Sequence, residues 1–274
     1  GDQVALARPG YVAYRNTIRA LNLVPLEIEC GEDTRFQLTA AQISALDPAP
    51  AGLIIASPAN PTGTILPEAE LAAIVAVCAE RGIRIISDEI YHGLSYGPRT
   101  ASVLEHTADA FVINSFSKYF SMAGWRLGWI VSPDDMASRV GAYIGNMFLT
   151  APSLSQHAGL VAMDCRDELE GHVRTYMHNR DLMLAALPAL GLERIAPPDG
   201  AFYIYADISR FTDDSLAFCM QLLKDTGVAT APGVDFDPVD GHRYMRFSFA
   251  VSTTEVEDAL ARITPWFEAR GQSR

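Results

Sequence analysis

Paired cysteines and long apolar runs are both missing from this sequence. Its four cysteines, at positions 30, 78, 165 and 219, lie far apart, and none belongs to a C-x-x-C pair. With six histidines in all, the sequence has no spacing typical of zinc ligands, so we expect no metal site. Reduced, buried cysteines in a cytoplasmic protein are the simplest expectation. No apolar run approaches the roughly 18 residues of a membrane-spanning helix, so we expect no membrane partner.

Positive charge is also scarce. Lysine and arginine contribute 21 residues against 33 aspartates and glutamates, which gives a formal net charge of −12. Such a charge repels the phosphates of nucleic acids and of anionic membranes, so we expect neither as a partner. A local cationic pocket for a small anion is compatible with this balance. The 274 residues can bury roughly three quarters of their unfolded surface, in one large core or two smaller ones.

The first residues, GDQVALARPG, contain neither the basic start nor the apolar core of a signal peptide. The sequence begins with glycine and reads as if it started within a domain. We therefore expect a further segment upstream of residue 1.

The first half of the sequence alternates short apolar runs with longer amphipathic runs. This alternation predicts an α/β fold in which helices cover a mostly parallel sheet. Helical spacing of apolar residues predicts helices over Pro67–Glu80 and from Ser132 toward Met147. The expected strands are Val4–Ala7, Val24–Ile28, Leu53–Ala56, Ile83–Ser87, Phe111–Asn114 and Leu127–Val131.

The second half predicts a smaller α+β domain. One long helix is expected from about Ser153 to Leu187, because Pro188 ends the helical pattern. We place the domain boundary near Met163, which gives a large domain over residues 1–163 and a small domain over 164–274. Further strands are expected at Ala201–Ala206 and Tyr244–Phe249, and further helices at Ser215–Thr226 and Thr253–Arg270.

Residues 114–129, NSFSKYFSMAGWRLGW, contain the most chemical information. A lone lysine is usually a solvated surface charge. Here, however, Ser115 and Ser117 precede Lys118, and Arg126 follows it. Two hydroxyl donors and a bidentate guanidinium are what a phosphate monoester needs. A partly desolvated lysine in such a pocket has a lowered pKa and can form an imine.

This stretch resembles the cofactor-lysine motif of the class I pyridoxal-phosphate aminotransferases, which have fold type I. The resemblance implies that Lys118 holds pyridoxal phosphate as a Schiff base, and that Ser115, Ser117 and Arg126 bind its phosphate. It extends from residue 1 to about residue 270. Full-length members of this family begin roughly a hundred residues earlier, about the size of one subdomain. They are homodimers with shared active sites, which we expect here as well.

Two further motifs resemble the parts of this family that hold the cofactor ring. The first is PANPTG at residues 58–63, which by itself would be an ordinary turn; the resemblance assigns Asn60 to the phenolic oxygen of the cofactor. The second is IISDEIY at residues 85–91. There the family pairs Asp88 with the pyridine nitrogen, which makes the ring an electron sink, and assigns Tyr91 to the same phenolic oxygen.

The remaining motifs concern the substrate and the ring face. Arg246, in YMRFSFA, would usually be an edge-strand charge, but the family places its clamp for the substrate α-carboxylate there. Phe202, in PDGAFY, is implied to contact the substrate, with core packing as an equal alternative. Tyr11, in PGY, is implied to stack on the cofactor, with simple packing as its alternative.

Together these residues predict an aminotransferase. It would move an amino group from an amino acid to a 2-oxo acid, with Lys118 as general base and acid. One alternative keeps the cofactor but makes the protein a lyase or decarboxylase, since the fold does not decide the reaction. Another is a non-catalytic regulatory domain that binds the same cofactor.

Overall fold

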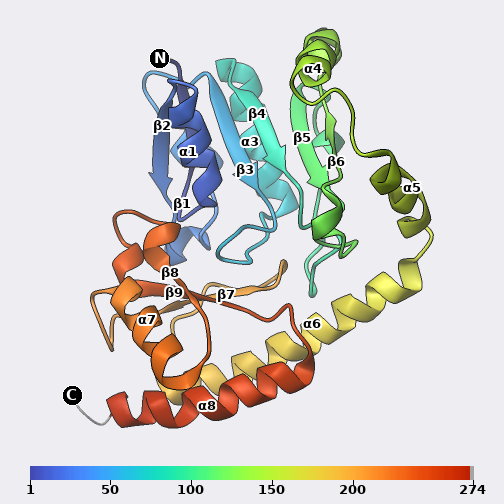
Figure 1. Cartoon of the computed structure of the whole chain (residues 1–274). Helices are drawn as coiled ribbons and strands as arrows, with labels where there is room; N and C mark the ends of the chain where they lie inside the picture. Colours follow the sequence, from blue (N-terminus) through green and yellow to red (C-terminus); the bar gives the residue numbers. More distant parts are fainter. Residues whose placement is uncertain (272–274) are drawn as a thin grey trace.

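Six strands form the large sheet of this protein, in the order β2-β1-β3-β4-β5-β6 (Figure 1). The computed structural model describes residues 1–271. Strands β1 to β5 pair in parallel, as the sequence predicts, whereas β6 runs antiparallel to β5. Only residues 116–127 join β5 to β6, and no α-helix forms in this connection to return the chain for parallel pairing. The strands are β1 Gln3–Arg8, β2 Val24–Glu29, β3 Gly52–Ala56, β4 Arg84–Asp88, β5 Ala110–Ser115 and β6 Gly128–Val131.

Helix α3 (Glu68–Arg81) provides much of the core beside this sheet. Its buried side chains, Leu71, Ile74, Val75 and Cys78, follow helical spacing and pack with buried residues of β3, β4 and β5. This matches the helix predicted at that position. The other helices that accompany the large sheet are α1 Val12–Ala20, α2 Ala40–Ser44 and α4 Asp134–Met147.

The single long helix expected from Ser153 to Leu187 is wrong. The chain forms α5 (Ser153–Ala162) and α6 (Arg166–Ala186), which point in different directions (Figure 1). Between them, the amides of Asp164 and Cys165 donate to carbonyls only three residues back, which is turn geometry. The spacing of apolar residues in the sequence does not reveal such a bend. The domain boundary predicted near Met163 lies at this break and stays a prediction.

The small sheet lies below the large one in Figure 1 and has three antiparallel strands in the order β7-β9-β8. Its core joins the sheet to α6, α7 and α8 through buried residues such as Phe247, Leu222 and Ile263. Within residues 1–271, no helix has the length and apolar character needed to cross a membrane. The elements are β7 Tyr203–Asp207, β8 Ala231–Pro232, β9 Tyr244–Ser248, α7 Ser215–Thr226 and α8 Thr253–Gly271.

Several 3₁₀ helices connect these elements. They are η1 Glu32–Thr34, η2 Val103–Glu105, η3 Ala123–Trp125, η4 Leu187–Leu190, η5 Gly233–Asp235 and η6 Gly241–Arg243. The carboxyl ends of the parallel strands all meet at the edge of the large sheet that faces the small sheet (Figure 1). Ligands of open α/β sheets bind at this edge. A binding site is therefore expected at the loops that follow β1, β3, β4 and β5.

Candidate active site

A cavity of about 390 Å³ lies where these loops meet the small sheet. It brings together eight of the residues that the sequence singles out, from positions as far apart as 11 and 246. Ser115 and Phe202 are not part of its lining. The lining residues are Tyr11, Tyr14, Asn60, Asp88, Ile90, Tyr91, Ser117, Lys118, Ala123, Arg126, Tyr203 and Arg246.

Lys118 follows β5 and is half-buried among aromatic rings. Its Nζ lies 5.6 Å from the ring centroid of Tyr91 and 5.5 Å from that of Phe202. Burial lowers the pKa of Lys118, and the positive charge of Arg246 lowers it further, while Asp88 opposes both. A lysine that releases its proton more readily presents a neutral amine, which is the nucleophilic form.

Asp88 ends β4 and points its carboxylate into the cavity. Oδ2 accepts a hydrogen bond from the Tyr14 hydroxyl, and Oδ1 accepts one from the Ile90 amide at 3.1 Å. Burial raises the pKa of Asp88, and both hydrogen bonds oppose that rise because they favour the charged form. The sequence reasoning did not identify Tyr14. The sequence does contain a signal for Tyr14: it lies three residues after Tyr11, and residues three apart share a face at the start of α1.

Tyr91 and Tyr203 form a buried hydroxyl pair on the other side of the cavity. Their hydroxyl oxygens are 2.8 Å apart, and burial raises the pKa of both phenols. Tyr203 was not predicted either. The prediction chose its neighbour Phe202, whose ring packs edge-on against Tyr91 and Tyr176. Phe202 therefore borders the lysine amine, whereas Tyr203 lines the cavity.

Arg246 lies on β9, the middle strand of the small sheet, so it is not an edge-strand charge. Its guanidinium carbon lies 4.2 Å from the ring centroid of Tyr203 and 4.7 Å from that of Phe236. Nη1 donates to the Asn60 Oδ1 at 2.7 Å, while Nε is buried without a partner. Burial lowers the pKa of Arg246. A guanidinium that lies against two rings at the wall of the cavity suits a planar anion such as a carboxylate.

The predicted phosphate ligands lie at the junction with an adjoining cavity of about 400 Å³. Ser117 and Arg126 line both cavities, whereas Ser115 lines only the adjoining one. The Ser115 Oγ lies 2.9 Å from the Ser117 Oγ and accepts from the Ser117 amide at 3.0 Å. The Arg126 Nη1 donates to the Ala123 carbonyl, and the side chain is exposed. An anion at this junction would therefore contact Ser117 and Arg126 directly, with Ser115 behind Ser117.

Tyr11 lines the cavity from the loop after β1. The residue is 43% exposed, and its ring meets the Tyr14 ring edge-on at a centroid distance of 5.5 Å. An exposed ring at the cavity wall has a face available for stacking. Its stacking on a cofactor stays a prediction.

These residues fit pyridoxal phosphate as a set. The cofactor has an aldehyde, a basic ring nitrogen, a phenolic oxygen and a phosphate. The same cavity offers an amine, a buried carboxylate, hydroxyl and amide donors, and a guanidinium. The second guanidinium of the lining, that of Arg246, remains for a substrate.

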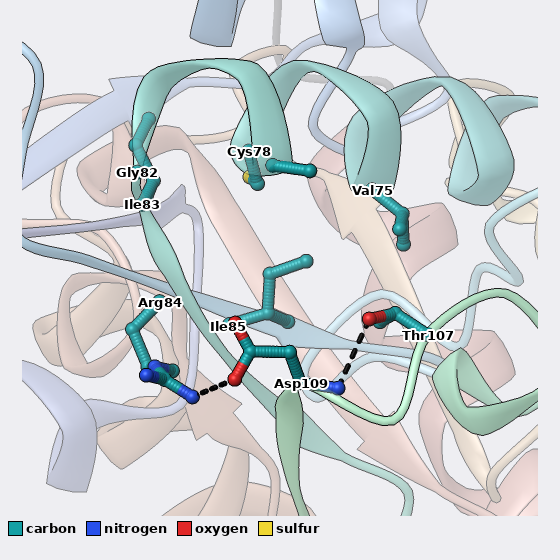
Figure 2. A pocket seen from close by; sticks show the side chains of 9 residues that line it. Val75, Cys78, Gly82, Ile83, Arg84, Ile85, Thr107 and Asp109 are labelled. Carbon is teal, nitrogen blue, oxygen red and sulfur yellow. Dashed lines mark hydrogen bonds and ion pairs between the residues drawn. The ribbon is translucent and has the colours of Figure 1, made fainter. Parts of the chain in front are cut away.

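A separate cavity, of about 200 Å³, lies at the amino end of β4 and beside the end of α3 (Figure 2). Its charged residues, Arg84 and Asp109, pair with each other. Burial raises the pKa of Cys78 to about 11, so this thiol is not a nucleophile near neutral pH. Among the described residues, no group of three or more His, Cys, Asp or Glu side chains is arranged to hold a metal ion. Neither observation supports a second catalytic site.

Comparisons with known proteins identify aminotransferases as the proteins that this chain resembles. The family described as "Aminotransferase class I and II" matches residues 1–263. A valine–pyruvate aminotransferase of Mycobacterium tuberculosis is 48% identical over an alignment of 274 residues. The alignment covers 98% of this chain and 71% of that protein. A probable N-acetyl-LL-diaminopimelate aminotransferase of Bacillus subtilis is 35% identical, with coverages of 96% and 67%.

Solved structures are similar over the same range. An aminotransferase from Mycobacterium tuberculosis superposes with a TM-score of 0.96 at 48% identity, covering 98% of this chain and 70% of that one. Aspartate aminotransferase from Thermus thermophilus, solved with maleate, gives a TM-score of 0.89 at 30% identity, with coverages of 97% and 70%. The α/β fold predicted from the sequence is thus confirmed.

Proposed function

Because this chain belongs to the class I and II aminotransferase family, whose members use pyridoxal phosphate, we propose that it transfers the amino group of a neutral L-amino acid to a small 2-oxo acid. The observation that carries this proposal is the shared cavity of Lys118, Asp88 and Arg246. A branched aliphatic donor such as valine, with pyruvate as acceptor, is the first candidate, by analogy with the valine–pyruvate relative.

The predicted amino-group transfer is confirmed by the family, and the relatives described above are all named as aminotransferases. The lyase, decarboxylase and regulatory alternatives gain no support from them. In the part of the chain that the structure describes, the cations that line the cavity are Lys118, Arg126 and Arg246. All three are assigned to the cofactor and the α-carboxylate, so the preference for a neutral donor rests on the valine–pyruvate relative.

The bound cofactor would supply an electron-withdrawing ring that stabilises negative charge next to the substrate Cα. Lys118 would carry the cofactor covalently. Asp88 would hold a proton on the ring nitrogen, because a buried carboxylate favours a positive partner. Tyr91 and Asn60 would donate to the phenolic oxygen. We assign the phosphate to Ser117, Arg126 and Ser115, and the ring face to Tyr11.

During the reaction, Lys118 would move the proton. Its Nζ has a lowered pKa, so it can take a proton from the substrate Cα and give it up again. Arg246 would fix the substrate carboxylate with its guanidinium, and thereby the orientation of the Cα–H bond relative to Lys118. The rings of Tyr203 and Phe236 on Arg246 hold this guanidinium in place.

Borohydride trapping tests the central assignment. Lys118 and Lys224 are the two lysines of the sequence, which makes the result easy to read. After reduction of the protein with bound pyridoxal phosphate, mass spectrometry should locate the adduct on the peptide with Lys118. Lys118→Ala should lose the adduct and the visible absorption of the bound cofactor, and Lys224→Ala should keep both. An adduct that survives in Lys118→Ala would reject the assignment.

A donor panel tests the substrate. L-valine, L-alanine and L-aspartate would be offered with pyruvate or 2-oxoglutarate, and the 2-oxo acid and amino acid products would be quantified. We expect L-valine and L-alanine to be used far better than L-aspartate, with one 2-oxo acid formed per amino group transferred. A strong preference for L-aspartate would reject the neutral-substrate proposal but leave the family assignment intact.

We propose further that the protein is a homodimer and is located in the cytoplasm. β6, α4 and α5 expose large apolar side chains next to one another in the sequence, including Trp129, Ile144, Met147, Phe148 and Leu160. Exposed apolar groups of this extent are typical of interaction surfaces. Trp129 also lines the cavity that adjoins Ser117, so a partner on this surface would lie close to the site. The unpaired cysteines support the location.

A further inference from the structure

We propose that the ion pair between Arg8 and Asp237 is a positioning device for Arg246, and that it sets the affinity for the carboxylate of the substrate. The inference rests on the proposed role of Arg246 as the carboxylate clamp. Arg8 is the last residue of β1, and Asp237 lies in the loop between β8 and β9. Neither residue lines the cavity, so neither contacts the substrate directly.

The carboxylate of Asp237 organises its own loop. Its Oδ1 accepts from the amides of Val239 and Asp240, at 2.9 and 3.0 Å, and from the Arg8 Nη1 at 3.0 Å. At the ends of the loop, Gly233 and Gly241 approach so closely that a Cβ on either would lie within 2.4 Å of the other's backbone. The loop is therefore a compact turn, built around one buried oxygen.

The same turn places the ring that packs on Arg246. Phe236 directly precedes Asp237, is buried, and has its ring centroid 4.7 Å from the guanidinium carbon of Arg246. Its carbonyl accepts from the Gly10 amide at 3.1 Å. The large sheet therefore holds Phe236 at two points, through Gly10 and through Arg8. A shift of the Phe236 ring would move one of the two rings between which Arg246 lies.

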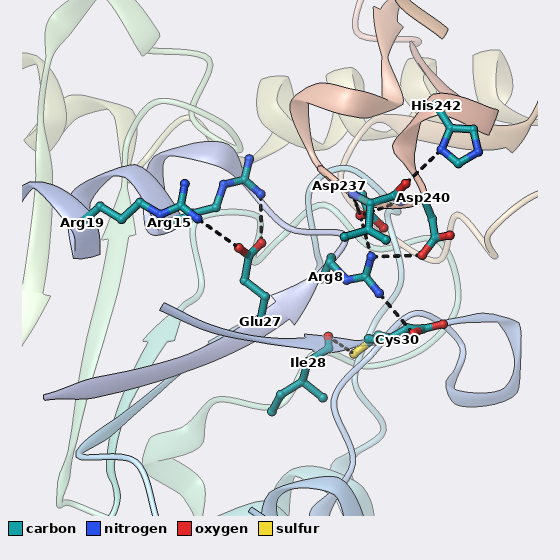
Figure 3. Close-up of polar contacts among 11 residues, drawn as sticks. Arg8, Arg15, Arg19, Glu27, Ile28, Cys30, Asp237, Asp240 and His242 are labelled. Carbon is teal, nitrogen blue, oxygen red and sulfur yellow. Dashed lines mark hydrogen bonds and ion pairs between the residues drawn. The ribbon is translucent and has the colours of Figure 1, made fainter. Parts of the chain in front are cut away.

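The ion pair is buried and well satisfied. The side chains of Arg8 and Asp237 are 9% and 5% exposed, and Arg8 also contacts Asp240 at 3.0 Å and Glu29 at 3.1 Å (Figure 3). Replacing Arg8 leaves the buried Asp237 carboxylate without its counter-ion, so the surrounding segments rearrange. Here those segments are the end of β1 and the Phe236 turn. Replacing Asp237 leaves Arg8 paired with Asp240 and Glu29 but breaks its bond to the centre of the turn, which is a milder change. Displacements of about 1 Å in a positioning group can reduce binding or turnover strongly.

The test separates binding of the carboxylate from reaction with the amine. The probes are 3-methylbutanoate, which is valine without its amino group, and isobutylamine, which is valine without its carboxylate. Binding of 3-methylbutanoate to the holoenzyme would be measured by calorimetry, and the reaction of isobutylamine by the visible absorbance of the cofactor. We expect Arg8→Met and the milder Asp237→Asn to weaken 3-methylbutanoate binding about tenfold, less than the roughly hundredfold effect that a misplacement of about 1 Å can have. The rate with isobutylamine should stay unchanged.

Asp207→Asn is the matched control. Asp207 is a buried carboxylate of the small sheet that pairs with Arg194 at 3.0 Å and does not contact the Phe236 turn. Its removal should leave the affinity for 3-methylbutanoate unchanged. The proposal would be overturned if the Arg8 and Asp237 variants lost affinity for 3-methylbutanoate and rate with isobutylamine to the same extent. It would also be overturned if Asp207→Asn lost the same affinity for 3-methylbutanoate, because either result would mean that the whole fold had become less rigid. Wild-type affinity for 3-methylbutanoate in Asp237→Asn would also overturn the proposal. Because Asp237→Asn preserves the shape of the side chain, it provides the test even if Arg8→Met does not fold.

Arg246→Ala distinguishes this inference from the function on which it rests. If that variant binds 3-methylbutanoate as wild type does, the clamp assignment fails, and the positioning role fails with it. If Arg246→Ala loses the affinity while the Arg8 and Asp237 variants keep it, the clamp assignment stands and only the positioning role is rejected.

Discussion

At the scale of single residues, the surroundings of Lys118 oppose its charged form. Burial and the nearby Arg246 lower its pKa, and Asp88 compensates only in part. In the unfolded chain, the pKa returns to its ordinary value of 10.5. The folded protein therefore binds fewer protons than the unfolded chain between the lowered value and 10.5. Its stability rises with pH across that window, because unfolding takes up a proton there.

We expect Lys118→Met to stabilise the cofactor-free protein at pH 7. The substitution removes a partly desolvated charge and keeps the length of the side chain. The thermal midpoint should rise by about 2 °C, a shift that corresponds to roughly half to 1 kcal/mol in a chain of this size. Lys224→Met, on the exposed side of α7, should change it less. A lower midpoint in Lys118→Met would contradict the idea that Lys118 is held at a cost to stability.

Tyr14 acts on Asp88, and its contribution has a pH signature. The Tyr14 hydroxyl favours the ionised carboxylate, so Tyr14→Phe should raise the pKa of Asp88 further. The affinity for pyridoxal phosphate should fall about tenfold, the usual effect of losing a hydrogen bond to a charged group. Its decline on the acid side should also begin at higher pH. Fluorescence titrations with the cofactor between pH 5 and 8 measure both.

The control for this experiment is Tyr119→Phe. Tyr119 also donates to a carboxylate, that of Glu170 at 2.7 Å, but lies outside the cavity lining. Its loss should leave the pH profile of cofactor binding where it is. An unshifted profile in Tyr14→Phe would reject the coupling between Tyr14 and Asp88.

At the scale of elements, the ends of helices decide how the loops reach the site. Helix α3 ends at Arg81 and is capped by Gly82, which adopts φ +67° and donates its amide to the Cys78 carbonyl. This left-handed residue turns the chain directly into β4, at whose other end Asp88 lies. Glycine suits this position because it adopts positive φ without strain.

Two glycine substitutions with opposite signs test this reading. Gly82→Ala should destabilise the protein by about 1 kcal/mol, through backbone strain alone, because no atom lies within 4 Å of the added Cβ. Gly171→Ala, within α6, should stabilise it by about 0.5 to 1 kcal/mol, since alanine has the higher helix propensity. Urea unfolding at pH 7 measures both. A stabilising Gly82→Ala would show that the left-handed turn is not needed.

Helix α1 shows why some elements were not predicted from the sequence. Two of its side chains, Arg15 and Arg19, lie against Glu27 of β2, at 2.9 and 3.7 Å (Figure 3). Arg15 is buried, although charged residues are usually counted as solvent-facing. The helix is nine residues long, so an apolar pattern repeats only a few times along it. Its partner Glu27 lies on a different element, which a local pattern does not include.

At the scale of the whole molecule, the exposed apolar surface of α4 predicts association. Phe148 follows α4 and is 67% exposed. Phe148→Asp should place a charge in the proposed dimer interface and convert dimers to monomers. Light scattering during size-exclusion chromatography measures the mass. Val239→Asp, at a 61% exposed apolar residue outside this surface, should leave the mass unchanged. A monomeric wild-type protein, or a dimeric Phe148→Asp, would reject this interface.

The sequence by itself determined most of the strands and several of the helices, and it predicted the role of Lys118. Short apolar runs and helical spacing depend on neighbours within a few residues, which is why most predicted strands and α7 agree with the structure. The motif around Lys118 is likewise contiguous. Asp88, Asn60 and Arg246 could be proposed because each lies in a short motif of its own.

Only the tertiary structure decided which side chains meet. Tyr14, Tyr203 and Phe236 lie far apart in the sequence, and their approach to Asp88, Tyr91 and Arg246 depends on the packing of the two sheets. The direction of β6 and the break between α5 and α6 are of the same kind. Each depends on contacts between distant segments, whose free energies do not appear in any local pattern of residues.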